Sequence, residues 1–195
     1  MKILAFSDIH DEITYLDIIN KKTKKYDPDI LICAGDISFF ARNLNSSMTV
    51  LKKLNKPTLI IPGNHETAAD IFSFKSENLI PLHKQIYIKD DYCFYGYGGG
   101  GFSQTANDLF NNFKKFENKF ENKKLIIVTH FPPYKTDLDI INKIHVGNKT
   151  LRDIILKYSP KIVISGHLHE NERKSSYINK TLCINPGPKG IFLKI

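Results

Sequence analysis

Cysteine is scarce in this chain, and its few thiols do not suit a disulfide or thiolate framework. Cys33, Cys93 and Cys183 are odd in number and widely spaced, with no C-x-x-C pair among them. This pattern excludes a small disulfide-stapled scaffold and a cysteine-based zinc site. Cys33 lies inside the apolar run ILICAGD, where we expect a small buried hydrophobic residue. Reduced thiols are typical of a cytoplasmic protein.

Long apolar runs and linkers are absent too. No stretch approaches the roughly 20 apolar residues that a membrane-spanning helix needs. The opening run in MKILAFSD holds about five, too few for the core of a signal peptide. The chain has no low-complexity segment, fixed-period repeat or Pro/Gly/Ser-rich linker. We therefore expect residues 1–195 to form a single cytoplasmic domain with no membrane segment.

The charge balance is positive. Lysine and arginine number 28 against 20 acidic residues, which gives a formal net charge of +8 at pH 7. Such an excess of positive charge can favour binding of nucleic acid, binding of an anionic substrate, or solubility alone. The lysines occur as scattered pairs, mostly at predicted helix faces and ends, and this distribution favours a solvated surface.

Several apolar runs end in a polar cluster. They read KILAFSDIH, DILICAGD, TLIIPGNHE, LIIVTH and IVISGHLH. Continuous Ile/Leu/Val runs without alternation are typical of strands covered on both faces. Apolar residues at helical spacing predict helices over 12–25, 46–55, 107–120 and 148–158. Short strands are expected in the tail at 173–179, 181–185 and 190–195, and the alternation as a whole predicts an α/β fold.

Ligand-type side chains stand at the end of each of these runs. Ligands of open α/β sheets bind outside the carboxyl ends of the strands, so these side chains would gather if the ends meet at one edge. An inventory of oxygen and imidazole without thiolate suits Mn, Fe or Zn. Glycines at 35, 63 and 166 allow sharp turns there. The candidate site residues are Asp8, His10, Asp36, Asn64, His65, His130, His167 and His169.

In this order, SDIH, GD, GNHE, TH and GHLH resemble the motifs of the calcineurin-like metallophosphoesterase family. They extend from residue 8 to residue 169, and the tail INPGP is similar to that of small members. HFPPYKTDLD and HVGNK are similar to a subgroup of small phosphodiesterase-like proteins. The resemblance implies a two-sheet β-sandwich flanked by helices, an α/β/β/α arrangement.

The resemblance also implies a role for each residue. Asp8, His10 and His169 would hold one divalent metal ion. Asn64, His130 and His167 would hold a second, and Asp36 would bridge the two and act in catalysis. His65 would reach the phosphate as a catalytic residue. The implied cofactors are two divalent ions chosen from Mn²⁺, Fe²⁺, Ni²⁺ and Zn²⁺, with Mn²⁺ favoured.

These roles predict a binuclear metal-dependent phosphohydrolase, most simply a phosphodiesterase. A hydroxide bridging the metals would attack the ester, because metal binding lowers the pKa of water from 15.7 to about 7. His65 could protonate the leaving alkoxide. The short chain leaves little room for a cap or docking domain, so a small-molecule phosphoester is the favoured substrate.

Other interpretations of single features remain. Asp8 and Asp36 could be helix N-caps, although this leaves the histidines unexplained. We expect His83 to be structural or solvated, and His145 to be the same or a substrate contact. The stretch GYGGGG at 96–101 fits G-x-G-x-x-G but lacks the acidic partner of a dinucleotide site, so we expect a turn. No G-x-S-x-G elbow supports serine catalysis.

Two alternative functions stay open. The charge of +8 motivates a nuclease or nucleotide-directed diesterase, and GDISFF places two phenylalanines after Asp36 that could stack on a nucleobase. No aromatic–basic recognition motif is present, which disfavours nucleic acid as a partner. A non-catalytic scaffold with the same fold would be expected to have lost a ligand or His65, and all are present.

Overall fold

The first of two large sheets has the strand order β13-β1-β2-β3-β4. The computed structural model describes residues 1–195, the side chain of Asn107 excepted. Strands β1 to β4 pair in parallel, whereas β13 is antiparallel to β1. The strands of this sheet are β1 (Lys2–Phe6), β2 (Ile30–Cys33), β3 (Thr58–Ile60), β4 (Leu79–Pro81) and β13 (Ile191–Lys194).

The second large sheet has the order β11-β12-β10-β7-β6-β5. Its four central strands are parallel, and the two edge strands are antiparallel to their neighbours. A separate two-stranded hairpin joins β8 (Ile140–Ile141) to β9 (Ile144–His145). The strands of the second sheet are β5 (Gln85–Lys89), β6 (Tyr92–Tyr97), β7 (Lys124–Thr129), β10 (Ile162–Ile164), β11 (Ser175–Ile178) and β12 (Thr181–Ile184).

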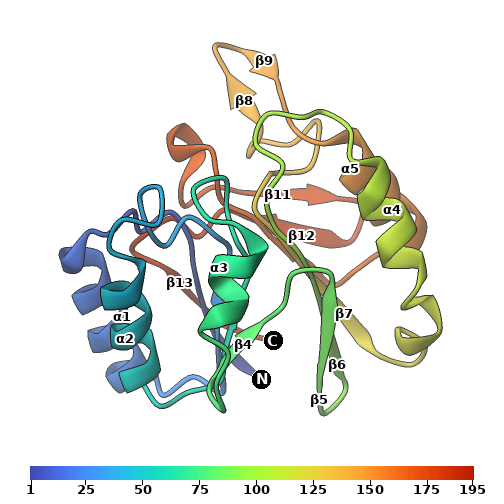
Figure 1. The fold of residues 1–195 in the computed structure, drawn as a ribbon. Coiled ribbons are helices and arrows are strands. Elements are labelled where there is room, and N and C mark those ends of the chain that lie inside the picture. Colours follow the sequence, from blue (N-terminus) through green and yellow to red (C-terminus); the bar gives the residue numbers. More distant parts are fainter.

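Helices cover the outer faces of both sheets. In Figure 1, α1 (Ile13–Tyr26) and α2 (Leu44–Lys53) lie outside the first sheet, and α4 (Asn107–Lys114) and α5 (Lys149–Tyr158) lie outside the second. The predicted helix-flanked two-sheet arrangement is therefore confirmed. The remaining helical segments are short: α3 (Ala68–Ser73) and the 3-10 turns η1 (Glu117–Lys119) and η2 (His169–Asn171).

Burial on both faces explains the continuous apolar strands. On β1, Ile3 and Ala5 pack in the core between the two sheets, together with residues of β7 and β10. The alternate residues Leu4 and Phe6 pack under α1 and α2. Each central strand thus has two apolar faces, as its sequence predicts. A third core lies between α4, α5 and the second sheet.

The predicted helices differ from the observed ones mainly at their ends. The pattern over 107–120 continues past the end of α4, because the chain turns there and brings the ring of Phe120 within 4.6 Å of the ring of Phe113. The three tail strands are confirmed as β11, β12 and β13. Among the described residues, no helix is long and apolar enough to cross a membrane.

Candidate metal centre

The carboxyl ends of β1, β2, β3, β7 and β10 meet where the two sheets adjoin. The backbone nitrogen of Asp8 donates to Gly35 O at 3.0 Å, within the first sheet. His130 Nδ1 donates to Ala34 O at 2.9 Å, and the backbone nitrogen of His167 donates to Asp8 Oδ1 at 3.1 Å. These last two bonds join the second sheet to the first. Candidate residues that are more than 100 positions apart in the sequence are therefore held together.

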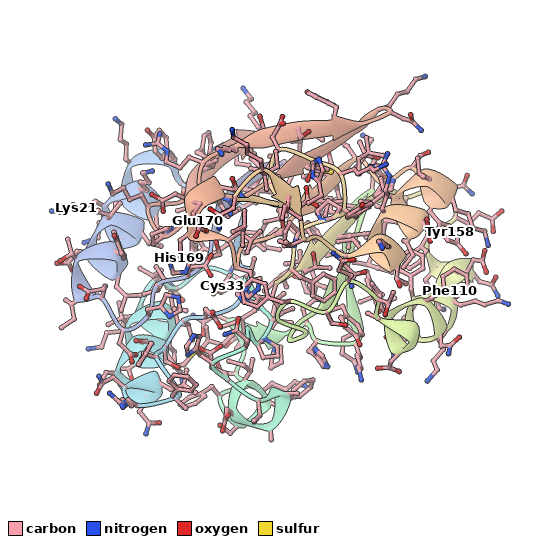
Figure 2. The ribbon with its side chains drawn as sticks, turned by 90° about the horizontal axis from the view of Figure 1, so that it is seen from above. Lys21, Cys33, Phe110, Tyr158, His169 and Glu170 are labelled. Carbon is pink, nitrogen blue, oxygen red and sulfur yellow. The ribbon has the colours of Figure 1, made fainter. Side chains whose placement is uncertain are left out.

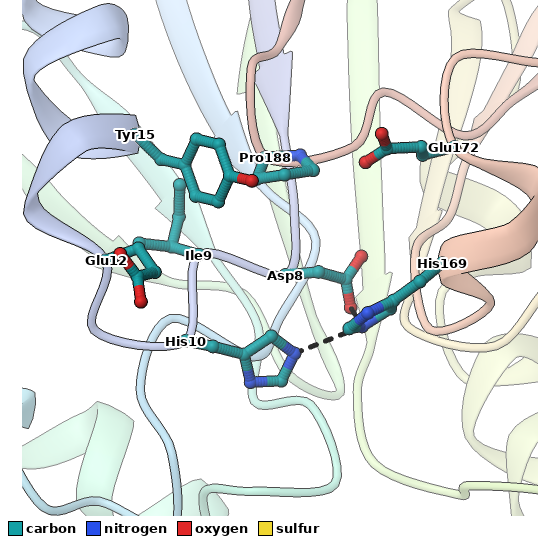
Figure 3. A pocket seen from close by; sticks show the side chains of 8 residues that line it. All are labelled: Asp8, Ile9, His10, Glu12, Tyr15, His169, Glu172 and Pro188. Atoms are coloured by element: carbon teal, nitrogen blue, oxygen red, sulfur yellow. Dashed lines mark hydrogen bonds and ion pairs between the residues drawn. The ribbon is translucent and has the colours of Figure 1, made fainter.

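Asp8, His10 and His169 form the first group of ligand atoms. His10 Nε2 lies 3.2 Å from His169 Nε2, and His169 Nε2 lies 3.7 Å from Asp8 Oδ1 (Figure 3). One ligand atom from each residue falls within 4.8 Å of the other two. Seen from above, His169 lies between the outer helix marked by Lys21 and those marked by Phe110 and Tyr158 (Figure 2).

Asp36 occupies the middle of the cluster. Its Oδ2 lies 3.3 Å from His130 Nε2, and 3.8 Å from the Nε2 atoms of both His10 and His65. Its Oδ1 accepts a hydrogen bond of 3.0 Å from the backbone nitrogen of His65. The carboxylate therefore belongs to two further groups of possible ligands, one with His10 and His65 and one with Asp8 and His130.

Asn64, His130 and His167 lie on the other side of Asp36. Asn64 Oδ1 is 3.0 Å from His130 Nε2, and the rings of His130 and His167 have centroids 5.0 Å apart. The structure thus brings together every residue that the sequence predicts for the site. An open pocket of about 380 Å³ borders them, lined by His10, Asp36, Asn64, His65, His167 and Phe39 among others.

Electrostatics couple Asp36 to His130. Burial alone would raise the pKa of Asp36, but the hydrogen bond and the charge of His130 lower it to about 2. Burial likewise opposes protonation of His130, yet the Asp36 carboxylate raises the pKa of this imidazole to about 9. Because His130 Nδ1 already donates to a backbone carbonyl, the proton between the two side chains is the one on Nε2. A cation at this position would replace that proton.

His10 and His167 are in the state that metal binding needs. Burial lowers the pKa of His167 to about 4 and also lowers the pKa of His10, so both rings are neutral at pH 7. His167 Nε2 is buried without a hydrogen-bond partner among the described residues. An orphaned buried imidazole nitrogen is unfavourable unless something binds it. Neutral imidazoles, carboxylates and an amide oxygen are a donor set that fits divalent transition-metal ions.

The backbone at the site is strained. Four residues of the site have φ angles in the left-handed region, which residues other than glycine rarely adopt. The angles are 57° at Asp8, 49° at His10, 51° at Asp36 and 73° at His167. Such conformations are typical of functional sites, where the surrounding structure enforces them. The interpretation of Asp8 and Asp36 as helix N-caps is wrong, because Glu12 and Asn43 occupy the N-cap positions of α1 and α2.

Glycine is needed where two of the loops touch. A Cβ atom at Gly63 would collide with the carboxylate and backbone nitrogen of Asp36. At Gly35, which has a φ of 96°, a Cβ atom would lie 2.7 Å from the backbone of Gly63 and from His130 Nδ1. These two glycines therefore let the loops after β2 and β3 approach closely enough to bring Asp36 beside Asn64 and His130.

Two buried or partly buried carboxylates support the site, and sequence reasoning missed both. Glu66 accepts hydrogen bonds from Ser38 N at 2.7 Å, Ser38 Oγ at 2.9 Å and Gly63 N at 3.0 Å, so it ties the two loops together. Asp11 accepts from Phe39 N at 2.9 Å. Glu66 is the last residue of the GNHE motif, and this position was the only available signal.

The two histidines outside the cluster differ in setting. His83 Nδ1 accepts a hydrogen bond of 2.9 Å from Gly98 N, and burial lowers its pKa to about 4, so its structural role is confirmed. His145 lies on the β8–β9 hairpin with Nδ1 2.7 Å from Asp139 Oδ1. The glycine-rich stretch completes β6 and then turns, with positive φ at Gly99, Gly100 and Gly101.

Comparison with known proteins agrees with this geometry. A family model described as calcineurin-like phosphoesterase matches residues 1–171. An uncharacterised protein of Methanocaldococcus jannaschii is 30% identical over 208 residues, which cover 99% of this chain and 91% of that protein. A probable glycerophosphodiester phosphodiesterase of Arcobacter nitrofigilis is 28% identical over 181 residues, or 83% of this chain. The alignment spans only 64% of that second relative.

Solved structures share the fold. A crystal structure of a Thermus thermophilus protein superposes with a TM-score of 0.79 at 16% sequence identity, covering 95% of this chain and 88% of that one. An archaeal phosphodiesterase gives a TM-score of 0.54 at 18% identity, covering 96% of this chain and 84% of that one. At these identities the likeness concerns the fold alone.

Proposed function

The chain belongs to the calcineurin-like phosphoesterase family, and we propose that it is a phosphodiesterase that uses two divalent cations. The observation that carries the proposal is the convergence of two carboxylates, one amide and five imidazoles at the edge of an open pocket. We assign Asp8, His10 and His169 to one cation, with Asp36 between both. We assign the second cation to Asn64, His130 and His167.

The residues themselves favour first-row metals. Imidazole nitrogen together with carboxylate and amide oxygen suits Mn²⁺, Fe²⁺, Ni²⁺ or Zn²⁺, and we propose Mn²⁺ as the preferred ion because oxygen donors are well represented. When bound, two such cations supply positive charge for the phosphate oxygens and a water molecule of lowered pKa. Because its pKa is about 2, Asp36 is a carboxylate at neutral pH. It can therefore bind both proposed cations.

His65 is the proposed proton donor. Its Nε2 lies 3.8 Å from Asp36 Oδ2, and its side chain is 13% exposed at the pocket. The backbone nitrogen of His65 donates a hydrogen bond to Asp36 Oδ1, and the ring of Phe39 stacks on the imidazole at 5.0 Å. These two contacts fix the orientation of His65. From this place the imidazole can donate a proton to the alkoxide that leaves the phosphorus atom, or neutralise its charge.

The open pocket supports a diester rather than a bulky protein substrate. At about 380 Å³ the pocket next to the cluster has the size of a small-molecule site. The similarity to a probable glycerophosphodiester phosphodiesterase supports the same substrate class. We therefore propose small phosphodiesters as substrates.

Hydrolysis of bis(p-nitrophenyl) phosphate tests this function. With Mn²⁺ or Ni²⁺ added, the wild type should release p-nitrophenol and Asp36→Ala should be inactive. Asp137→Ala, which changes an exposed aspartate outside the cluster, is the matched control and should retain activity. His65→Ala should lower turnover by about 10²–10⁴-fold while still binding metal. Equal activity in wild type and Asp36→Ala would reject the proposal.

A further inference from the structure

Three phenylalanine side chains surround the candidate metal centre. Phe39 stacks on His65 with ring centroids 5.0 Å apart, and Phe40 meets the same imidazole edge-on at 4.3 Å. The ring of Phe102 lies 4.6 Å from the ring of a different imidazole, that of His167. Phe39, His65 and His167 line the pocket, and Phe40 and Phe102 contact two of these lining residues.

Folding does not explain the position of these rings. Phe39, Phe40 and Phe102 are 42%, 63% and 66% exposed. Phe40 and the following Ala41 also have φ angles of 52° and 57°, a left-handed conformation that is unfavourable for residues other than glycine. Single exposed apolar residues are ordinary, but three exposed rings in contact with imidazoles of one pocket indicate a binding surface.

The three rings have different surroundings. The ring of Phe39 stacks on His65, and the guanidinium of Arg42 lies 5.5 Å from the centroid of the same ring. Phe39 therefore holds these two side chains in place. Phe40 and Phe102 keep most of their surface free for a planar ligand. Among the residues that the structure describes, the Arg42 guanidinium makes no hydrogen bond or ion pair, so its N–H groups can serve a ligand acceptor.

Resting on the phosphodiesterase function above, we propose that the site takes a nucleoside phosphodiester. The phosphate lies at the metal centre, and the nucleobase stacks on Phe40 or Phe102. Every nucleobase offers a flat face for such stacking, and its edge carries acceptors for a donor such as the guanidinium of Arg42, which lies beside Phe39. Hydrolysis adds one water, breaks one P–O bond, and yields a nucleoside monophosphate and an alcohol that carries the proton.

Binding of a product-like ligand tests this inference without turnover. Calorimetric titration of the Mn²⁺-loaded protein compares uridine 5′-monophosphate with ribose 5-phosphate, which carries a hydroxyl group in place of the base. Stacking on an aromatic side chain corresponds to about 5- to 150-fold in affinity. We expect the uridine nucleotide to bind at least about fivefold more tightly.

Variants assign that preference to the rings. Phe40→Leu and Phe102→Leu keep an apolar side chain and remove the aromatic face, and at least one should lower the preference about fivefold or more. Tyr177→Leu is the matched control, since Tyr177 is 67% exposed on the edge strand β11. It should keep the wild-type preference.

The outcomes separate the two proposals. A preference below about twofold in the wild type, no change in both phenylalanine variants, or an equal loss in Tyr177→Leu overturns the nucleoside inference. Base preference without any diester hydrolysis supports the nucleoside site and rejects the phosphodiesterase function. Hydrolysis of bis(p-nitrophenyl) phosphate without base preference does the reverse.

Discussion

Replacing Asp139 by asparagine tests how far one buried carboxylate holds the segment around the β8–β9 hairpin. Asp139 is 0% exposed. Its Oδ1 accepts from Thr136 N at 2.9 Å and lies 2.7 Å from His145 Nδ1. Its Oδ2 accepts from Lys135 N at 3.0 Å and from Gly147 N at 2.9 Å. Asparagine keeps the shape of this side chain and turns one of the two acceptors into a donor.

The structure sets the size of the effect. If the amide nitrogen takes the Oδ1 position, one backbone N–H loses its acceptor and His145 can change tautomer. In the Oδ2 position, two backbone N–H groups would lose theirs. An unsatisfied buried donor costs about 1–3 kcal/mol, so we expect Asp139→Asn to lower the free energy of unfolding by about that amount. For a chain of this size, the melting temperature should fall by roughly 2–12 °C.

Urea unfolding followed by circular dichroism, with EDTA present, measures this loss apart from any metal effect. The matched control is Asp137→Asn, the same chemical change at an exposed position two residues earlier. It should change the free energy of unfolding by less than about 0.5 kcal/mol. If the two variants unfold with the same free energy, the reasoning about the buried carboxylate is refuted.

Three further predictions concern the site and its surroundings. Gly63→Ala puts a methyl group against the Asp36 carboxylate, so Mn²⁺ affinity should fall about 10–100-fold in a chelator-competition titration, and an unchanged Kd would speak against the close approach. Because the pKa of His130 is raised to about 9, Mn²⁺ affinity should rise from pH 6.5 to 9 with proton release, whereas a pH-independent Kd would contradict this. The pKa of His83 is lowered to about 4, so the stability that it contributes is complete above pH 6.5 and is lost as pH falls toward 4. His83→Gln should weaken this acid dependence of the urea midpoint, and identical profiles would count against it.

The apolar pattern predicts strands that are covered on both faces, for a physical reason, whereas the two-sheet arrangement was predicted from the family resemblance alone. Strands such as β1 are apolar on both faces, and this requires a sheet covered on both sides. The short elements leave no such signal. Strand β4 has three residues, α3 has six, and β8 and β9 have two each, so tertiary contacts rather than local periodicity determine them.

The candidate ligands were predictable because each follows a strand whose end lies at the same edge. The supporting contacts were not, since they depend on the approach of loops that are distant in sequence. Nothing in the sequence places Glu66 under both Ser38 and Gly63. Phe102 lies in a glycine-rich turn whose sequence gives no sign that its ring meets His167. The φ angles of the ligand residues are likewise visible only in the structure.

Metal content tests the two-cation centre most directly. After loading with Mn²⁺ and desalting, elemental analysis should find about two ions per wild-type chain and about one or fewer in Asp36→Asn, because that carboxylate lies between both groups of ligands. Asp137→Asn should match the wild type. A wild-type chain that retains no metal, or an Asp36→Asn chain that retains as much as the wild type, would contradict the proposed centre.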